Sequence, residues 1–254
     1  MKKTSIAGAL ITSVMLVAGS AMAADMKAPA VYTKAPMPPP AFSWTGCYLG
    51  GGGGYGMWNQ ETFHETDPAH VATSPTQTGG GRGWFGTVQV GCDYQIASSF
   101  VIGAQGDWDF GNLKGTPNFS LDNIGDEKNS WTWAAGGRIG YVAFPQLLAY
   151  VSGGYTQAHF DQVNFFFDEA PTTSTLFINA NTYHGWYIGS GYEYGVSFLP
   201  GLFWKTEYRY SSFDSADLSH LLVTTGLSNG TASNSKKFIQ TIRSELVWRF
   251  NWFH

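Results

Sequence analysis

The sequence predicts an all-β fold, an eight-stranded antiparallel transmembrane β-barrel with short periplasmic turns and four long extracellular loops. Three observations lead to this prediction. From residue 43 onward, segments alternate apolar and polar side chains with a period of two. Short and long connections between the segments follow one another in strict rotation, which is typical of outer-membrane barrels. Aromatic residues make up 16% of the 254 residues, and they gather on one face of the segments.

The composition excludes several other classes of protein. Only 13% of the residues are charged and 43% are hydrophobic, so the chain as a whole is not disordered. The formal net charge of −4 provides no basic surface, and we expect no nucleic-acid partner. The 2 cysteines are too few for a disulfide-dense scaffold or a four-cysteine zinc site.

The first 23 residues have the pattern of a secretory signal peptide. Lys2 and Lys3 precede an apolar run at residues 6–18, and cleavage is expected between Ala23 and Ala24. The run is too short for a membrane helix, and no stop-transfer charges follow it. The sequence therefore predicts export to the periplasm and insertion into the bacterial outer membrane.

Residues 24–43 are expected to form a Pro-rich periplasmic linker ahead of a barrel at residues 44–254. Three consecutive prolines at 38–40 favour an extended polyproline conformation and cannot join a β-ladder. The linker is interpreted as an exposed tether, with a docking arm for the cell wall or another partner as the alternative.

Eight strands follow from the alternation. They are expected at residues 43–58, 83–95, 100–110, 131–143, 147–159, 184–196, 202–213 and 237–250. Short connections are expected at 96–99, 144–146 and 197–201, and long loops at 59–82, 111–130, 160–183 and 214–236.

The two faces of the strands differ in chemistry. In six of the strands every charged residue lies on the face opposite the rings. Eight strands enclose only enough space for side chains, so we expect the rings to face lipid. Trp84 and Tyr94 lie ten residues apart on one strand. At ~3.3 Å per residue and a tilt of ~40°, their heights across the membrane differ by about 25 Å, which is the height of the apolar band of a membrane barrel. The expected aromatic girdles comprise Trp84, Trp108, Trp131, Trp133 and Trp186 at one interface, and Tyr94, Tyr141, Tyr194, Trp204 and Trp248 at the other.

Inward-facing charges are expected to form one layer at mid-height in the lumen. Charges in a narrow interior need partners, and this layer holds three of each sign. We interpret it as an ion-paired plug that closes the lumen, with a gated or ion-selective pore as the alternative. Its expected members are Arg138, Glu193, Lys205, Glu207, Arg243 and Glu245.

Cys47 and Cys92 lie on adjacent predicted strands. If the first hairpin is symmetric, the two residues are cross-strand neighbours, and the periplasm would oxidise such a pair. The alternative is two small lipid-facing residues that never form a disulfide.

The first long loop is rich in groups that could bind a metal or perform acid–base chemistry. They are Glu61, His64, Glu65, Asp67, His70 and Ser74. Their spacing matches no compact ligand motif, so we interpret the loop as solvated. We predict no catalytic residue, no metal and no cofactor.

Three consecutive phenylalanines at residues 165–167 interrupt the polar third loop. They form an exposed contact patch in one interpretation. In the other, the strands extend past the membrane and the rings pack on that extension.

Four strand motifs resemble the outer-membrane immunogenic proteins, small β-barrels of the porin family. The motifs are WTGCYLG at 44–50 with GYG at 54–56, GCDYQ at 91–95, KTEYRY at 205–210 and VWRF at 247–250. The resemblance implies an OmpA-type barrel without a catalytic motif. Two features depart from that family, namely the residues 251–254 after the closing-strand Phe250 and the cysteines at positions 47 and 92.

These observations favour a structural and surface-interaction role, and the chain is not expected to be an enzyme. The resemblance also implies two alternatives, a small passive channel or a barrel that binds haem or another ligand. The expected partners are outer-membrane lipid, lipopolysaccharide and the barrel-assembly machinery, together with peptidoglycan or host surfaces. The barrel is expected to be a monomer.

Overall fold

The computed structural model describes residues 43–117, 123–167 and 170–250. The predicted signal peptide, its cleavage site at Ala23 and Ala24, linker residues 24–42 and residues 251–254 lie outside this description. Within the described ranges, no helix is long and apolar enough to cross a membrane.

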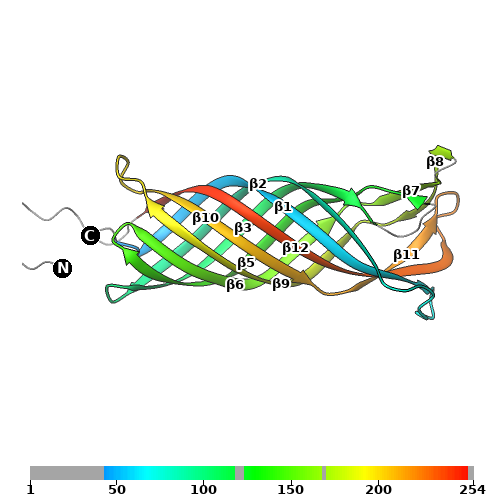
Figure 1. Ribbon diagram of the computed structural model, residues 1–254, viewed down its shortest axis with the longest axis horizontal. Helices are drawn as coiled ribbons and strands as arrows, with labels where there is room; N and C mark the ends of the chain where they lie inside the picture. Colours follow the sequence, from blue (N-terminus) through cyan, green and yellow to red (C-terminus); the bar gives the residue numbers. More distant parts are fainter. Residues whose placement is uncertain (1–42, 118–122, 168–169, 251–254) are drawn as a thin grey trace, which may run out of the picture. The chain divides into compact units, whose positions relative to one another are not determined.

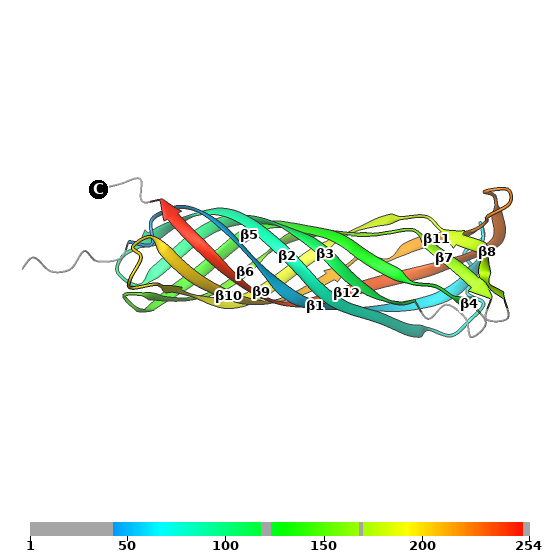
Figure 2. The same ribbon diagram turned by 90° about the horizontal axis from the view of Figure 1, so that it is seen from above.

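Eight long antiparallel strands pair side by side, and the last strand also pairs with the first, which closes the barrel (Figures 1 and 2). The eight-stranded fold predicted from the sequence is confirmed. In the order of the barrel wall, the strands are β1 (Gly46–Thr66), β2 (Gln77–Ile96), β3 (Phe100–Thr116), β5 (Glu127–Phe144), β6 (Leu147–Phe160), β9 (Asn181–Gly195), β10 (Leu202–Phe213) and β12 (Ser228–Phe250).

Four shorter strands extend the sheet at the end opposite the short turns, on the right of Figure 1. They are β4 (Asn123–Ile124), β7 (Val163–Phe167), β8 (Ala170–Ile178) and β11 (Ala216–Leu222). β11 pairs with β12 and with β8, β8 pairs with β7, and β7 pairs with β4. The short turns mark the periplasmic end, so this extension lies on the extracellular side.

The predicted long loops are too long. β1 and β2 pair as far as Thr62 and Gln77, well inside the loop expected at 59–82. β12 begins at Ser228, inside the loop expected at 214–236. In these extensions of β1, β2 and β12 both faces are mostly polar, so the apolar alternation stops while the backbone pairing continues.

The expectation that rings do not fit inside the barrel is also wrong in part. Tyr48 and Phe85 are buried in the lumen. A side chain at Gly91 would overlap the ring of Tyr48, and one at Gly54 would overlap Phe85. Glycines on the inner wall therefore make room for rings from the neighbouring strand, which explains part of the glycine run at 50–54.

Candidate functional site

The lumen holds the densest group of functional side chains in the described chain. At its periplasmic end, four fully buried groups form a closed ring of ion pairs. Arg138 binds Asp93 and lies 3.1 Å from Glu193, measured from Nη1 to Oε2. Arg249 binds the same two carboxylates, with 2.7 Å from its Nη1 to Asp93 Oδ2 and 2.7 Å from its Nε to Glu193 Oε1. This group carries two charges of each sign and is neutral.

A second group runs across the middle of the lumen as a chain of alternating charge. Successive members are linked by N···O distances between 2.8 and 3.8 Å. The order of the chain is Glu245, Lys205, Glu207, Arg209, Asp107, Arg243 and Asp109. Gln89 supports one end, since it accepts a 2.6 Å hydrogen bond from Lys205 and donates a 2.8 Å bond to Glu245.

A third group lies nearer the extracellular side. Lys237 is fully buried, and its Nζ lies 2.7 Å from Glu127 Oε1. Three rings surround the ammonium, with 5.1 Å to the ring of Trp58, 4.3 Å to Phe160 and 5.1 Å to Tyr183. Cation–π contacts and one ion pair together compensate a charge that has been removed from water.

Two apolar layers flank the central chain of charges. The periplasmic layer comprises Trp44, Tyr48, Val101, Leu148, Phe203 and Val247, and the extracellular layer comprises Trp58, Phe85, Leu113, Ala158, Phe160, Tyr183, Phe213 and Ile239. Between the central charges and the extracellular layer is a cavity of about 10 Å³, lined among others by Asp109, Arg243 and Leu113. A volume of this size holds about one water molecule.

All six predicted lumen residues are buried inside the barrel, but they do not form one layer. Arg138 and Glu193 belong to the periplasmic ring, whereas Lys205, Glu207, Arg243 and Glu245 belong to the central chain. Counting residues from the turns ignores the tilt of the strands, so it misjudges depth. The prediction also omitted seven charged partners, namely Asp93, Asp107, Asp109, Glu127, Arg209, Lys237 and Arg249. Inward-facing alternation in the expected strands could have identified six of them, whereas Glu127 lies in the loop expected at 111–130.

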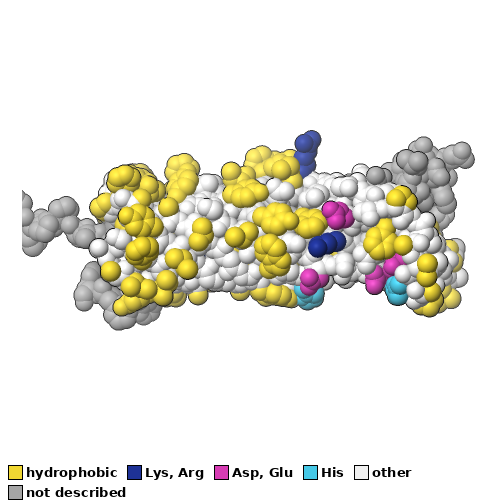
Figure 3. All heavy atoms as spheres, turned by 60° about the horizontal axis from the view of Figure 1, so that its bottom comes forward, with side chains coloured by type: hydrophobic (Ala, Val, Ile, Leu, Met, Phe, Trp, Pro, Cys, Tyr) yellow, Lys and Arg dark blue, Asp and Glu magenta, His cyan; other side chains and the backbone are white. Residues whose placement is uncertain are grey.

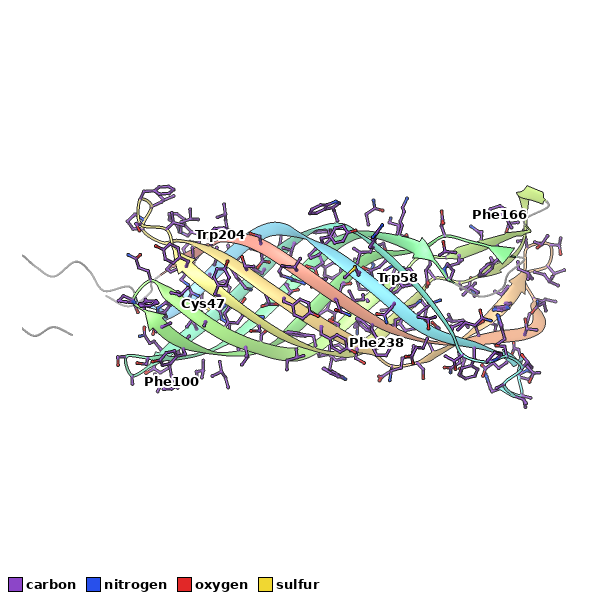
Figure 4. All side chains as sticks on the ribbon, viewed as in Figure 1. Cys47, Trp58, Phe100, Phe166, Trp204 and Phe238 are labelled. Carbon is purple, nitrogen blue, oxygen red and sulfur yellow. A yellow bond between two sulfur atoms is a disulfide. The ribbon has the colours of Figure 1, made fainter. Side chains whose placement is uncertain are left out.

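The structure joins Cys47 and Cys92 in a disulfide between opposing positions of β1 and β2. Alternation places both residues on the outer face of the wall, beside the exposed Leu49 and Tyr94. Figure 4 shows Cys47 close to the short-turn end of the barrel.

The outer wall carries a broad apolar band that begins at the short turns, and charged side chains appear beyond it (Figure 3). The ten residues predicted for the aromatic girdles lie on the outer face. Trp131 and Trp133 are half-buried, and eight are exposed, namely Trp84, Tyr94, Trp108, Tyr141, Trp186, Tyr194, Trp204 and Trp248.

Above the membrane, part of the ligand-rich first loop folds back over the sheet. His70 Nδ1 lies 2.8 Å from Glu65 Oε1 and 3.9 Å from Asp217 Oδ2. The hydrogen bond that Nδ1 donates to the carboxylate of Glu65 raises the pKa of His70. These three side chains could together ligate a metal ion, because their donor atoms lie within 4.8 Å of one another. The prediction treated the loop as solvated and gave no indication that Asp217 would join it.

A histidine lies in a buried position of the same extension. His220 Nε2 is 2.8 Å from Ser233 Oγ, and Nδ1 is 3.0 Å from Thr231 Oγ1. Burial lowers the pKa of His220 to about 4, and the nearby His64 contributes to this shift.

Of the phenylalanine triplet at 165–167, Phe165 is buried in a small cluster with Val163 and Ile178. The ring of Phe165 therefore packs on the sheet extension, and it is not part of an exposed patch.

A closed ring of antiparallel strands with an apolar outer wall and a charged interior defines a β-barrel protein of the bacterial outer membrane. The chain is similar to the 31 kDa outer-membrane immunogenic proteins of Brucella melitensis biotype 1 and Brucella suis biovar 1. It is 29% identical to each over 242 residues, which covers 92% of this chain and 95% of each relative. The resemblance inferred from the four strand motifs is thereby confirmed.

The fold is similar to that of the outer membrane protein OprG from Pseudomonas aeruginosa. The TM-score is 0.51, with 10% sequence identity over 81% of this chain and 97% of that chain. This likeness concerns the fold alone. No family model matches the chain.

Proposed function

We propose that this protein is a structural barrel of the outer membrane, with a closed lumen and an extracellular sheet that presents a surface for contacts. The observation that carries the proposal is the chain of paired charges from Glu245 to Asp109. These charges, flanked by two apolar layers, support a lumen that serves as a packed core.

The energetics also favour a scaffold over a passive channel. An ion or solute that crossed the lumen would have to separate buried ion pairs such as Arg209 and Asp107, 2.9 Å apart. Removing one member of a buried pair costs about 3–5 kcal/mol, and a crossing ion would meet several pairs in succession. The cavity of about 10 Å³ supplies no continuous path.

The strands rise past the apolar band and carry β7, β8 and β11 above it, which supports the surface-contact part of the proposal. A sheet that continues above the membrane holds its loops at fixed positions. We propose that these loops make the contacts of the protein with its surroundings, while the barrel supports them.

The scaffold role can be tested in a strain that lacks this chain. We expect the strain to become more sensitive to detergent and to recover when the full chain is restored. A matched variant with a short turn in place of residues 67–76 should restore detergent resistance but not surface contacts. If the deletion strain is no more sensitive to detergent, the structural role is overturned. If the full chain restores detergent resistance but the shortened variant does not, the resistance depends on the loop and not on the barrel.

A further inference from the structure

Two basic side chains face outward where the apolar band gives way to charged residues. Arg82 on β2 and Lys114 on β3 are both exposed and stand directly opposite each other in the strand register. Arg82 is the next outward position above Trp84, which is 73% exposed. The pair therefore lies at the height of the lipid headgroups in the outer leaflet.

Neither of these cations has an acidic partner among the described residues, and no acid stands opposite either of them in the strand register. Lys128, the next residue in the same register row, lies 3.5 Å from Asp161. Lys236 faces Glu61 in register and lies over the ring of Phe238. Like charges placed directly opposite each other destabilise a sheet, so the Arg82–Lys114 pair would be stabilised by an anion between them.

The pair borders a groove on the outer wall. The groove has a volume of about 590 Å³, and its lining includes Met57, Asn59, Thr116 and Gln240 from the neighbouring strands. The side-chain oxygen of Gln240 accepts a 2.8 Å hydrogen bond from Tyr208, which leaves the amide nitrogen as a donor. The groove thus combines two cations with neutral donors, and Met57 adds an apolar contact.

We propose that this groove binds a phosphate group on the headgroup of an anionic glycolipid in the outer leaflet of the membrane. The guanidinium of Arg82 has the fork geometry that grips phosphate through two hydrogen bonds, and Lys114 adds a compact positive charge. The sugar would meet the donors of Asn59, Thr116 and Gln240, and the acyl chains would lie along the apolar wall below Trp84. The site rests on the membrane location of the barrel and does not depend on whether the lumen is closed.

The test measures binding of bisphosphorylated lipid A to the purified, folded full chain by native mass spectrometry. The double variant Arg82→Gln with Lys114→Gln is expected to weaken binding at least about tenfold, the factor that corresponds to 1.4 kcal/mol. Lys236→Gln is the matched control, because it removes an outward cation that already faces an acid. A heat-dependent gel shift verifies that each variant is folded.

Lipid A without its phosphates should bind the native chain as weakly as the bisphosphorylated lipid binds the double variant. Equal binding of the bisphosphorylated lipid to the native chain and the double variant would overturn the proposal. Inorganic phosphate that bound as tightly as the lipid would also overturn it, because the ligand would then be a free anion. Equal losses in the double variant and in Lys236→Gln would assign the effect to net charge and not to this site.

Discussion

Arg138 and Glu193 meet inside the barrel, 3.1 Å apart, although their strands β5 and β9 are separated in the wall by β6. Their contact therefore passes through the lumen and not along the sheet. The same holds for Lys237 on β12 and Glu127 on β5. Charged side chains thus cross-link distant parts of the wall, and they make the interior a structural core.

The pair of Lys237 and Glu127 provides a direct test of this cross-linking. Lys237→Met leaves the carboxylate of Glu127 buried without a cation, so we expect a loss of about 3–5 kcal/mol in the free energy of unfolding. The double variant Lys237→Met with Glu127→Gln should recover most of that loss, because no unpaired charge remains. Urea titration of the protein in lipid vesicles measures both values.

Lys128→Met is the control for this pair. Lys128 and Asp161 are half-exposed and reach water, so we expect the free energy of unfolding to fall by less than about 1 kcal/mol. The coupling would be contradicted if the double variant lost as much free energy of unfolding as Lys237→Met and Glu127→Gln lose separately, added together.

The disulfide between Cys47 and Cys92 is expected to form in the exported protein. Alkylation of the denatured chain should label no thiol before reduction and both thiols after it. Replacement of both cysteines by serine should lower stability by about 2–4 kcal/mol, because the bond spans 45 residues of sequence. Two thiols labelled without reductant in the native protein would contradict this prediction.

The buried His220 predicts that the extracellular sheet is sensitive to acid. The pKa of His220 is about 4 in the folded protein and 6.5 in the reference state, so the unfolded chain binds the proton more readily. The neutral, buried His220 therefore makes its full contribution to the free energy of unfolding above pH 6.5. As the pH falls towards 4, the free energy of unfolding decreases by up to about 3 kcal/mol. The protection factors of the amides at residues 216–235, which correct hydrogen exchange for its intrinsic dependence on pH, should be smaller at pH 5 than at pH 7.

His220→Gln should remove most of this acid sensitivity, because the group no longer titrates. His70 provides the contrast, since its pKa is raised and its stabilising contribution is lost as the pH rises. Acid sensitivity that persists in His220→Gln and disappears in His70→Gln would show that His220 is the wrong group.

Sequence alternation was sufficient to predict the strands of the barrel and the outward rings such as Trp84, because each strand has one face in lipid. It could not predict the depth of Arg138 relative to Lys205, which depends on the tilt and stagger of the closed sheet. The approach of Asp217 to His70 also has no local signal, since it depends on the pairing of β12 with both β1 and β11. The extracellular extensions of β1, β2 and β12 were missed because both faces of those segments are mostly polar.

The central claim is that the lumen is closed, and ion conductance of the purified barrel in a planar bilayer tests it most directly. A heat-dependent gel shift first verifies that the protein is folded. The account predicts a silent membrane, because the charged groups are paired and flanked by apolar layers. Reproducible single-channel steps that change in Arg138→Ala or Glu193→Ala would contradict it, and they would show that the barrel is a channel.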